Sequence, residues 1–136
     1  MQKLDGFYEV SYDRGRKLLR ITTYGFWNLD VVGQFGRAIA EVLQTADPLC
    51  DTLLNTCRTE IHTTEVTEAL GRLSDLYKGS DVARVAIVSP SMLLRMQTKR
   101  MQNAEADYGY FETEEEALAW LATPVQSVAP QARAAG

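Results

Sequence analysis

The sequence has few of the residues that build covalent or metal-dependent sites. Its 136 residues include two cysteines, Cys50 and Cys57, and one histidine, His62. Both cysteines belong to one strand-like run, and at ~3.3 Å per residue their Cα atoms would lie about 23 Å apart, whereas a disulfide needs less than ~7 Å. No further His or Cys stands at zinc-ligand spacing. We therefore expect free thiols, no metal and no cofactor.

Positive charge is also scarce. Lys and Arg number 14 against 18 Asp and Glu, which gives a formal net charge of −4 at pH 7. Nucleic acids and anionic membranes attract basic surfaces, so this charge argues against both as partners. The chain has no apolar run near the ~18 residues of a membrane span and no basic, apolar leader. We expect a cytoplasmic protein without membrane insertion.

The length and composition are those of a globular domain. The hydrophobic content is 46% and the charged content 24%, and 136 residues are enough to bury a core without staples. We predict one α/β domain over residues 6–122. From Thr123 onward, Pro, Ala, Gln and Ser follow one another without periodicity, so we predict a disordered tail over residues 123–136.

The most apolar stretch is Val82–Ser89, read V-A-R-V-A-I-V-S and followed by Pro90. It is rich in β-branched residues and too short for a surface helix, so it predicts a strand buried on both faces in a parallel sheet. Two earlier runs, Gly6–Tyr12 and Lys17–Tyr24, are separated by a short polar turn that contains a glycine. This pattern predicts an antiparallel hairpin at the start of the domain.

Helical periodicity and start signals predict four helices. The expected caps are Asn28, then Thr63 or Thr64, then Ser89 followed by Pro90, and finally Thr113 with Glu116. The second helix reaches Tyr77 and the third about Glu105. The remaining strands are Leu49–Asn55 and Tyr108–Phe111. Because strands alternate with helices after the hairpin, right-handed crossovers predict a mixed five-stranded sheet with four helices.

Three segments resemble a known family. They are Gly25–Asn28 (G-F-W-N) before an amphipathic helix, Ala83–Val88 (A-R-V-A-I-V) and Tyr110–Leu121 (Y-F-E-T-E-E-E-A-L-A-W-L). They resemble the SpoIIAA-like family of small bacterial proteins, which is related in fold to STAS domains and discussed alongside Sec14-type lipid-binding domains. The resemblance covers about Gly6–Leu121. It implies a STAS-like fold and self-association as a homodimer, with no established activity.

One departure from the STAS pattern concerns phosphorylation. STAS-type antagonists of anti-sigma factors carry a phosphorylatable serine in an Asp-Ser-x-Gly turn after the third strand. Here residues 55–64 read N-T-C-R-T-E-I-H-T-T, without the aspartate-serine pair or the glycine, so we do not expect that phosphoswitch. Thr63 and Thr64 are still candidates for phosphorylation at a helix start, where the added charge is favourable, or they are simply caps.

The carboxyl ends of the predicted parallel strands gather a second set of candidates. These are Cys57, Arg58, His62, Ser89 and Ser91, since ligands of such sheets bind beyond the strand ends. A Cys-His pair beside an arginine is one way to form a thiolate nucleophile at an anion site. No third orienting group is evident, however, so ordinary loop residues are the preferred interpretation. The helix start after Ser89 either binds an anion through its backbone N–H groups or is only capped.

The third predicted helix and one loop corner supply the other candidates. The helix carries Met92, Met96 and Met101 among the basic residues Arg95, Lys99 and Arg100. The methionines either fill the core or line an adaptable contact surface. The basic stripe either meets an acidic partner or is a solvated face. At the corner, Phe26 and Trp27 either cover the core edge or gate an apolar pocket.

Two main hypotheses of function follow, and neither is catalytic. The leading one is a non-enzymatic binding or regulatory module that acts through protein–protein contacts, as a homodimer with a further protein partner. The alternative is a carrier or sensor of a small apolar or lipid-like ligand, held between the sheet and the Phe26–Trp27 segment or the methionine-bearing helix, and it predicts a deep apolar cavity. A third and weaker option is a thiol enzyme that uses Cys57.

Overall fold

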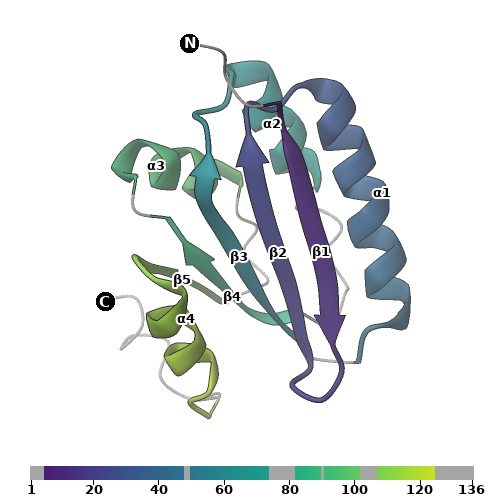
Figure 1. Cartoon of the computed structure of the whole chain (residues 1–136), viewed down its shortest axis with the longest axis vertical. Coiled ribbons are helices and arrows are strands. Elements are labelled where there is room, and N and C mark those ends of the chain that lie inside the picture. Colours follow the sequence, from purple (N-terminus) through teal and green to yellow (C-terminus); the bar gives the residue numbers. More distant parts are fainter. Residues whose placement is uncertain (1–4, 48–49, 74–81, 90, 102–106, 125–136) are drawn as a thin grey trace.

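The computed structural model describes residues 5–47, 50–73, 82–89, 91–101 and 107–124 (Figure 1). The elements are β1 (Phe7–Asp13), β2 (Leu18–Gly25), α1 (Leu29–Thr45), β3 (Cys50–Thr59), α2 (Thr64–Leu73), β4 (Val82–Val88), α3 (Met92–Met101), β5 (Asp107–Phe111) and α4 (Glu114–Leu121). The predicted order of strands and helices is confirmed. The expected helix ends at Tyr77 and Glu105, the Pro90 helix start and most of the predicted tail lie outside the described residues.

The five strands form one sheet in the order β1-β2-β3-β4-β5. β1 and β2 pair antiparallel, and the other neighbouring pairs are parallel. The sheet is therefore a hairpin followed by parallel strands, as predicted. β4 lies between β3 and β5, and Val85, Ala86, Ile87 and Val88 are each no more than 4% exposed. The doubly buried strand expected from the sequence is confirmed.

Helices cover both faces of the sheet. Because alternate residues of a strand point to opposite faces, Leu19 packs with Ile39 of α1, whereas Leu18 packs with Ala117 of α4. The helix α2 packs beside α1, and α3 contacts α2. The helices α1, α2 and α3 thus form one layer, and α4 is the one described helix on the other side of the sheet (Figure 1).

Three of the predicted helix caps are present. Asn28 Oδ1 accepts a hydrogen bond from the N–H of Val31 at 3.0 Å, and Thr63 Oγ1 accepts one from the N–H of Val66 at 3.2 Å. Thr113 Oγ1 accepts from the N–H of Glu116 at 3.2 Å and also donates to the Glu116 carboxylate. Each bond satisfies a donor that the first turn of a helix leaves free.

The cap of α3 corrects the sequence prediction. Ser91 Oγ, rather than Ser89, accepts the hydrogen bond from the N–H of Leu94 at 3.2 Å. The reason is that Ser89 still belongs to the sheet, where its N–H donates to the Phe111 carbonyl at 2.9 Å. The parallel ladder between β4 and β5 therefore extends past Val88, and the helix begins two residues later than predicted.

Arg84 is a buried cation that the apolar pattern of β4 did not predict. It is 3% exposed and forms an ion pair with Asp51, at 3.1 Å between Nη2 and Oδ2. Its guanidinium also donates to the carbonyls of Trp120, Leu121 and Thr123 at 3.2, 2.7 and 3.0 Å. These carbonyls lie at the C-terminal end of α4, where the helix ladder stops, and the Trp120 carbonyl also accepts from the Thr123 N–H at 3.1 Å. Arg84 therefore ties the last helix to the middle of the sheet.

Candidate functional site

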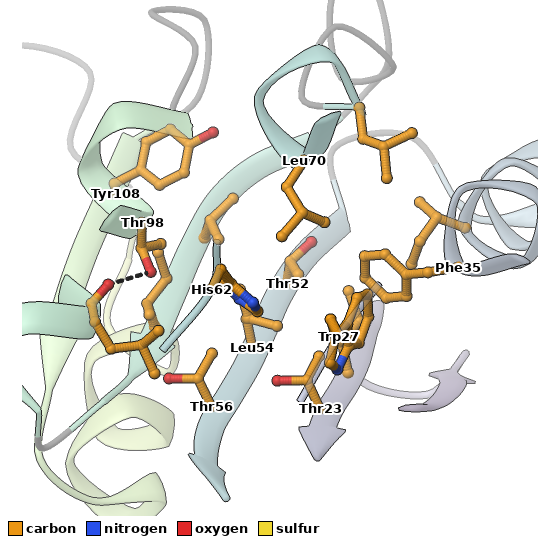
Figure 2. Close-up of a pocket in the computed structure, with 16 residues that line it drawn as sticks. Thr23, Trp27, Phe35, Thr52, Leu54, Thr56, His62, Leu70, Thr98 and Tyr108 are labelled. Atoms are coloured by element: carbon orange, nitrogen blue, oxygen red, sulfur yellow. Dashed lines mark hydrogen bonds between the residues drawn. The ribbon is translucent and has the colours of Figure 1, made fainter. Parts of the chain in front are cut away.

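A cavity of about 120 Å³ lies between the sheet and the layer formed by α1, α2 and α3 (Figure 2). Its wall is mostly apolar and includes the rings of Trp27, Phe35 and Tyr108. Trp27 and Phe35 meet edge to face, with 5.1 Å between ring centroids. The aromatic rings therefore form a rigid part of the wall, as in typical small-molecule pockets.

The strand β3 contributes two threonines of different character to this wall. Thr52 and Thr56 stand four residues apart and face the same side of the sheet. Thr56 Oγ1 donates to the Val88 carbonyl at 2.9 Å. Thr52 is 1% exposed, and its Oγ1 has no hydrogen-bond partner among the described residues. An unpaired buried hydroxyl costs free energy, so Thr52 requires an explanation.

His62 adds a second polar atom of this kind. Its ring lies edge-on to Trp27, with 6.1 Å between centroids, and Figure 2 shows it among the residues that enclose the cavity. Burial lowers the pKa of His62 to about 4, so the ring is neutral at pH 7. In the described part of the chain, its buried Nδ1 also has no hydrogen-bond partner. We call Thr52 Oγ1 and His62 Nδ1 the cavity polar pair.

The loop that carries His62 is held in place by α3. The His62 N–H donates to Gln97 Oε1 at 3.0 Å, and Gln97 Nε2 donates to the His62 carbonyl at 2.8 Å. Leu94 and Thr98 of the same helix line the cavity, and Thr98 Oγ1 donates to the Leu94 carbonyl. One side of α3 therefore forms part of the cavity wall and holds the loop backbone at His62.

The opposite side of α3 faces solvent. Met92, Leu93 and Met96 are 72%, 56% and 51% exposed, and we call them the α3 outer face. Arg95 is half-buried because its Nε donates to the Ser89 carbonyl at 2.5 Å, and Lys99 lies over the Tyr110 ring. Met92 and Met96 therefore do not fill the core, and the side chain of Met101 lies outside the described residues.

Trp27 belongs both to the core and to the cavity wall. It is 1% exposed and packs with Val32 and Val66 in the core, and it also lines the cavity. Its Nε1 donates to the Tyr24 carbonyl at 2.9 Å, which satisfies the indole. Phe26 is half-buried in the same corner. Gly6 lies so close that a Cβ there would meet Trp27 Cδ1 at 2.7 Å, so this contact requires glycine.

Cys57 and His62 belong to different surroundings. Cys57 is exposed near the end of β3, and its backbone N–H donates to Asn55 Oδ1 at 2.9 Å. Desolvation and the nearby Glu114 raise the pKa of its thiol, while Arg58 lowers it less. The thiolate is therefore disfavoured at neutral pH, which is the reverse of what a cysteine nucleophile needs. Cys50, the other free thiol, is buried in the core.

The other sequence candidates are distributed as follows. Thr63 caps α2 and Thr64 is its first residue; both are exposed, and their phosphorylation stays a prediction. The Ser89 side chain is fully buried, while the Ser91 hydroxyl caps α3. The described residues hold no group of three or more His, Cys, Asp or Glu side chains that fits a metal ion. None of the described helices is long and apolar enough to cross a membrane.

The sequence analysis missed the cavity threonines. Thr52 and Thr56 alternate with Leu54 on one face of β3, and Thr23 of β2 adds a third hydroxyl to the same wall. Thr23 Oγ1 and Thr59 Oγ1 share a short hydrogen bond. A polar side chain at every fourth residue of a buried strand is a readable signal, because the face that carries it then needs partners that an apolar core does not supply.

The sheet order, the antiparallel start and the helices on both faces define a SpoIIAA-like, STAS-type α/β fold. This agrees with the family resemblance of the sequence. No protein-family model matches the sequence, and no curated protein matches it. The assignment of the fold is therefore carried by solved structures.

Three solved structures resemble this chain. An uncharacterized protein of the DUF3478 family with a SpoIIAA-like fold, from Shewanella loihica PV-4, superposes with a TM-score of 0.68 and 18% identity over 89% of this chain and 98% of that chain. An anti-sigma factor antagonist from Mycobacterium paratuberculosis gives 0.61 and 11% over 87% and 95%. The anti-sigma factor antagonist SpoIIAA in its unphosphorylated form gives 0.59 and 18% over 88% and 99%. At these identities the likeness establishes the fold.

Proposed function

We propose that this protein is a non-enzymatic regulatory module that acts through protein–protein contacts, and that the α3 outer face is its contact surface. The observation that carries the proposal is the exposure of Met92, Leu93 and Met96 side by side on one helix. Neighbouring apolar side chains that are rich in methionine are typical of interaction sites. The cytoplasmic location expected from the sequence is part of this proposal.

The charge around this surface selects the kind of partner. Arg95, Lys99 and Arg100 belong to α3, and the helix sequence M-L-L-R-M-Q-T-K-R-M contains no acidic residue. A partner with an acidic rim complements this helix, whereas two copies meeting through α3 would bring like charges together. We therefore favour an acidic protein surface as the occupant, and the homodimer expected from the family resemblance is the competing outcome.

Two further observations support a role in binding rather than catalysis. The raised pKa of the Cys57 thiol weakens the one nucleophile that the sequence suggested. In addition, two of the matching structures are anti-sigma factor antagonists, so the fold includes proteins that are named for their effect on another protein.

Site-specific photocrosslinking in the cells that produce the protein tests this proposal. A photoreactive amino acid replaces Met96 in one version and Glu41, an exposed residue of α1, in a matched control. We expect a discrete adduct from position 96 and none from position 41, with the crosslinked peptide of the partner rich in Asp and Glu. Arg100→Glu should reduce the yield of this adduct, because it reverses a charge beside the contact.

Three results would contradict the proposal. An adduct with the mass of two copies of this chain would assign the α3 outer face to a homodimer. Equal adducts at positions 96 and 41 would indicate unspecific contact. No adduct at position 96, with the modified protein folded and expressed, would remove α3 as the contact surface.

A further inference from the structure

We infer that the cavity binds a small neutral molecule with a single-ring apolar body and one hydroxyl group, the size and chemistry of a phenol. This inference is independent of the contact proposed for the α3 outer face. It assigns the inner side of the same helix layer to a ligand, and it rests on the volume of the cavity, its apolar wall and the cavity polar pair.

The volume sets the size of the ligand. At about 120 Å³, the cavity is close to an engineered protein cavity of ~150 Å³ that admits benzene. One ring with a short substituent fits such a space, whereas the long acyl chain of a lipid would extend beyond it. The sequence suggested a small apolar or a lipid-like ligand as the alternative. Of these two, the volume favours the small apolar ligand.

The wall sets the shape of the ligand. Trp27 and Phe35 present rings to the cavity from one side, and Tyr108 contributes a third ring. Aromatic side chains attract a further ring in edge-to-face or offset geometry, at centroid separations of about 4.5–7 Å. Trp27 already contacts both Phe35 and His62 within this range, at 5.1 and 6.1 Å. An aromatic ligand would extend an existing cluster of rings.

The cavity polar pair sets the functional group. The Thr52 hydroxyl both donates and accepts, and Nδ1 of a neutral imidazole does one or the other according to its tautomer. A ligand hydroxyl can donate to His62 Nδ1 or accept from the Thr52 O–H, so it can give either atom the hydrogen-bond partner that the described residues do not supply. The hydroxyls of Thr56 and Thr98 already donate hydrogen bonds to the carbonyls of Val88 and Leu94, respectively.

The wall also sets the charge. Apart from the hydroxyls and the imidazole, the residues that line the cavity are apolar, and burial holds the His62 ring neutral at pH 7. A charged ligand would lose its hydration without gaining a counter-charge. The chemistry therefore excludes carboxylates and amines of the same size.

The test compares phenol with toluene, which has the same shape but a methyl group in place of the hydroxyl. Each compound is titrated at pH 7.5 into the full chain, and the amide signals in two-dimensional ¹H–¹⁵N NMR report the binding site. We expect both compounds to move the signals of residues that line the cavity, with phenol binding more tightly. Benzoate, the charged probe, should leave these signals unchanged.

Two variants then locate the hydroxyl. Thr52→Val removes the unpaired hydroxyl without changing the size of the side chain, and Thr56→Val does the same for the paired hydroxyl four residues along the strand. We expect Thr52→Val to lower the preference for phenol over toluene by about three- to tenfold, the value of one net hydrogen bond. Thr56→Val should leave this preference unchanged.

Two outcomes would overturn the inference. If neither phenol nor toluene moves the cavity signals of the wild-type protein at millimolar concentration, the cavity is closed to ligands and ordered water is the partner of the polar pair. If toluene binds the wild type far more tightly than phenol, the loss of phenol hydration is not offset and the polar pair plays no part in recognition. Both outcomes are measured on the wild-type protein, so they do not depend on how well either variant folds.

Discussion

One buried polar side chain on each side of the sheet shows two opposite situations. On the α4 side, Arg84 is buried with a carboxylate and three helix-end carbonyls as partners. On the cavity side, Thr52 is buried at least as deeply, but none of the described residues bonds to its hydroxyl. The comparison separates two functions of buried polarity: the first arrangement stabilises the fold, while the second leaves bonding capacity for something outside the chain.

The largest expected effect tests the satisfied side. Arg84→Met removes the guanidinium and leaves Asp51 and the carbonyls at the end of α4 without their donor. Breaking a buried pair in this way typically costs about 3–5 kcal/mol, so we expect the free energy of unfolding in urea to fall by about that amount.

Arg20→Met is the matched control for this change. Arg20 pairs with Glu114 at 3.1 Å, but both side chains are 36% exposed, so the loss should stay within about 1 kcal/mol. A loss from Arg84→Met no larger than that from Arg20→Met would show that the α4 side does not depend on its buried cation.

The second effect tests the cavity side through pH. The pKa of His62 is about 4 in the folded chain and ~6.5 when unfolded. Between these values the unfolded chain holds a proton that the folded chain lacks. The contribution of the neutral His62 ring to the free energy of unfolding is therefore fully present above about pH 6.5. It is lost as the pH falls toward 4, by on the order of 2–3 kcal/mol.

Urea unfolding of the wild type and of His62→Gln, measured at pH 7 and pH 4.5, isolates this contribution. Carboxylates titrate in both proteins, so the difference between them reports the imidazole. The same pH dependence in both proteins would mean that His62 is protonated in the folded state as readily as in the unfolded chain.

The smallest effect sharpens the comparison within one strand. Thr56→Val removes a hydroxyl that bonds to the Val88 carbonyl, and we expect it to cost about 1 kcal/mol. Thr52→Val removes a hydroxyl that forms no hydrogen bond with the described residues, so this substitution should be neutral or stabilising by up to about 1 kcal/mol. Thermal unfolding of both variants without added ligand gives the order, and a larger loss for Thr52→Val would reveal a partner for its hydroxyl.

Much of the fold could be predicted because its determinants are local. The caps Asn28, Thr63 and Thr113 act within three residues, and the β-branched run of β4 carries its burial in its own composition. The cap at Ser91 was missed because the ladder between Ser89 and Phe111 joins residues 22 positions apart. Local preference cannot register such a contact.

The site was predicted less well than the fold, for a physical reason. His62 was singled out for its chemistry and Trp27 as an aromatic residue that covers the core edge or gates a pocket, and both line the cavity. The volume itself depends on how three helices pack over the sheet, which no single segment encodes. The lack of a partner for Thr52 Oγ1 is likewise a property of its surroundings. A threonine in a strand gives no warning of this, because its β-branched side chain suits a sheet.

The clamp at Arg84 also has a consequence for how the chain is made. The carbonyls that receive its hydrogen bonds come 36–39 residues later in the sequence, so a growing chain contains the whole of β4 well before it contains them. Until Trp120 has been synthesised, Asp51 is the one member of this set of partners that is available to Arg84. The domain core is thus completed only after α4 has been synthesised. Nascent chains that end before this helix should therefore be good substrates for chaperones and proteases.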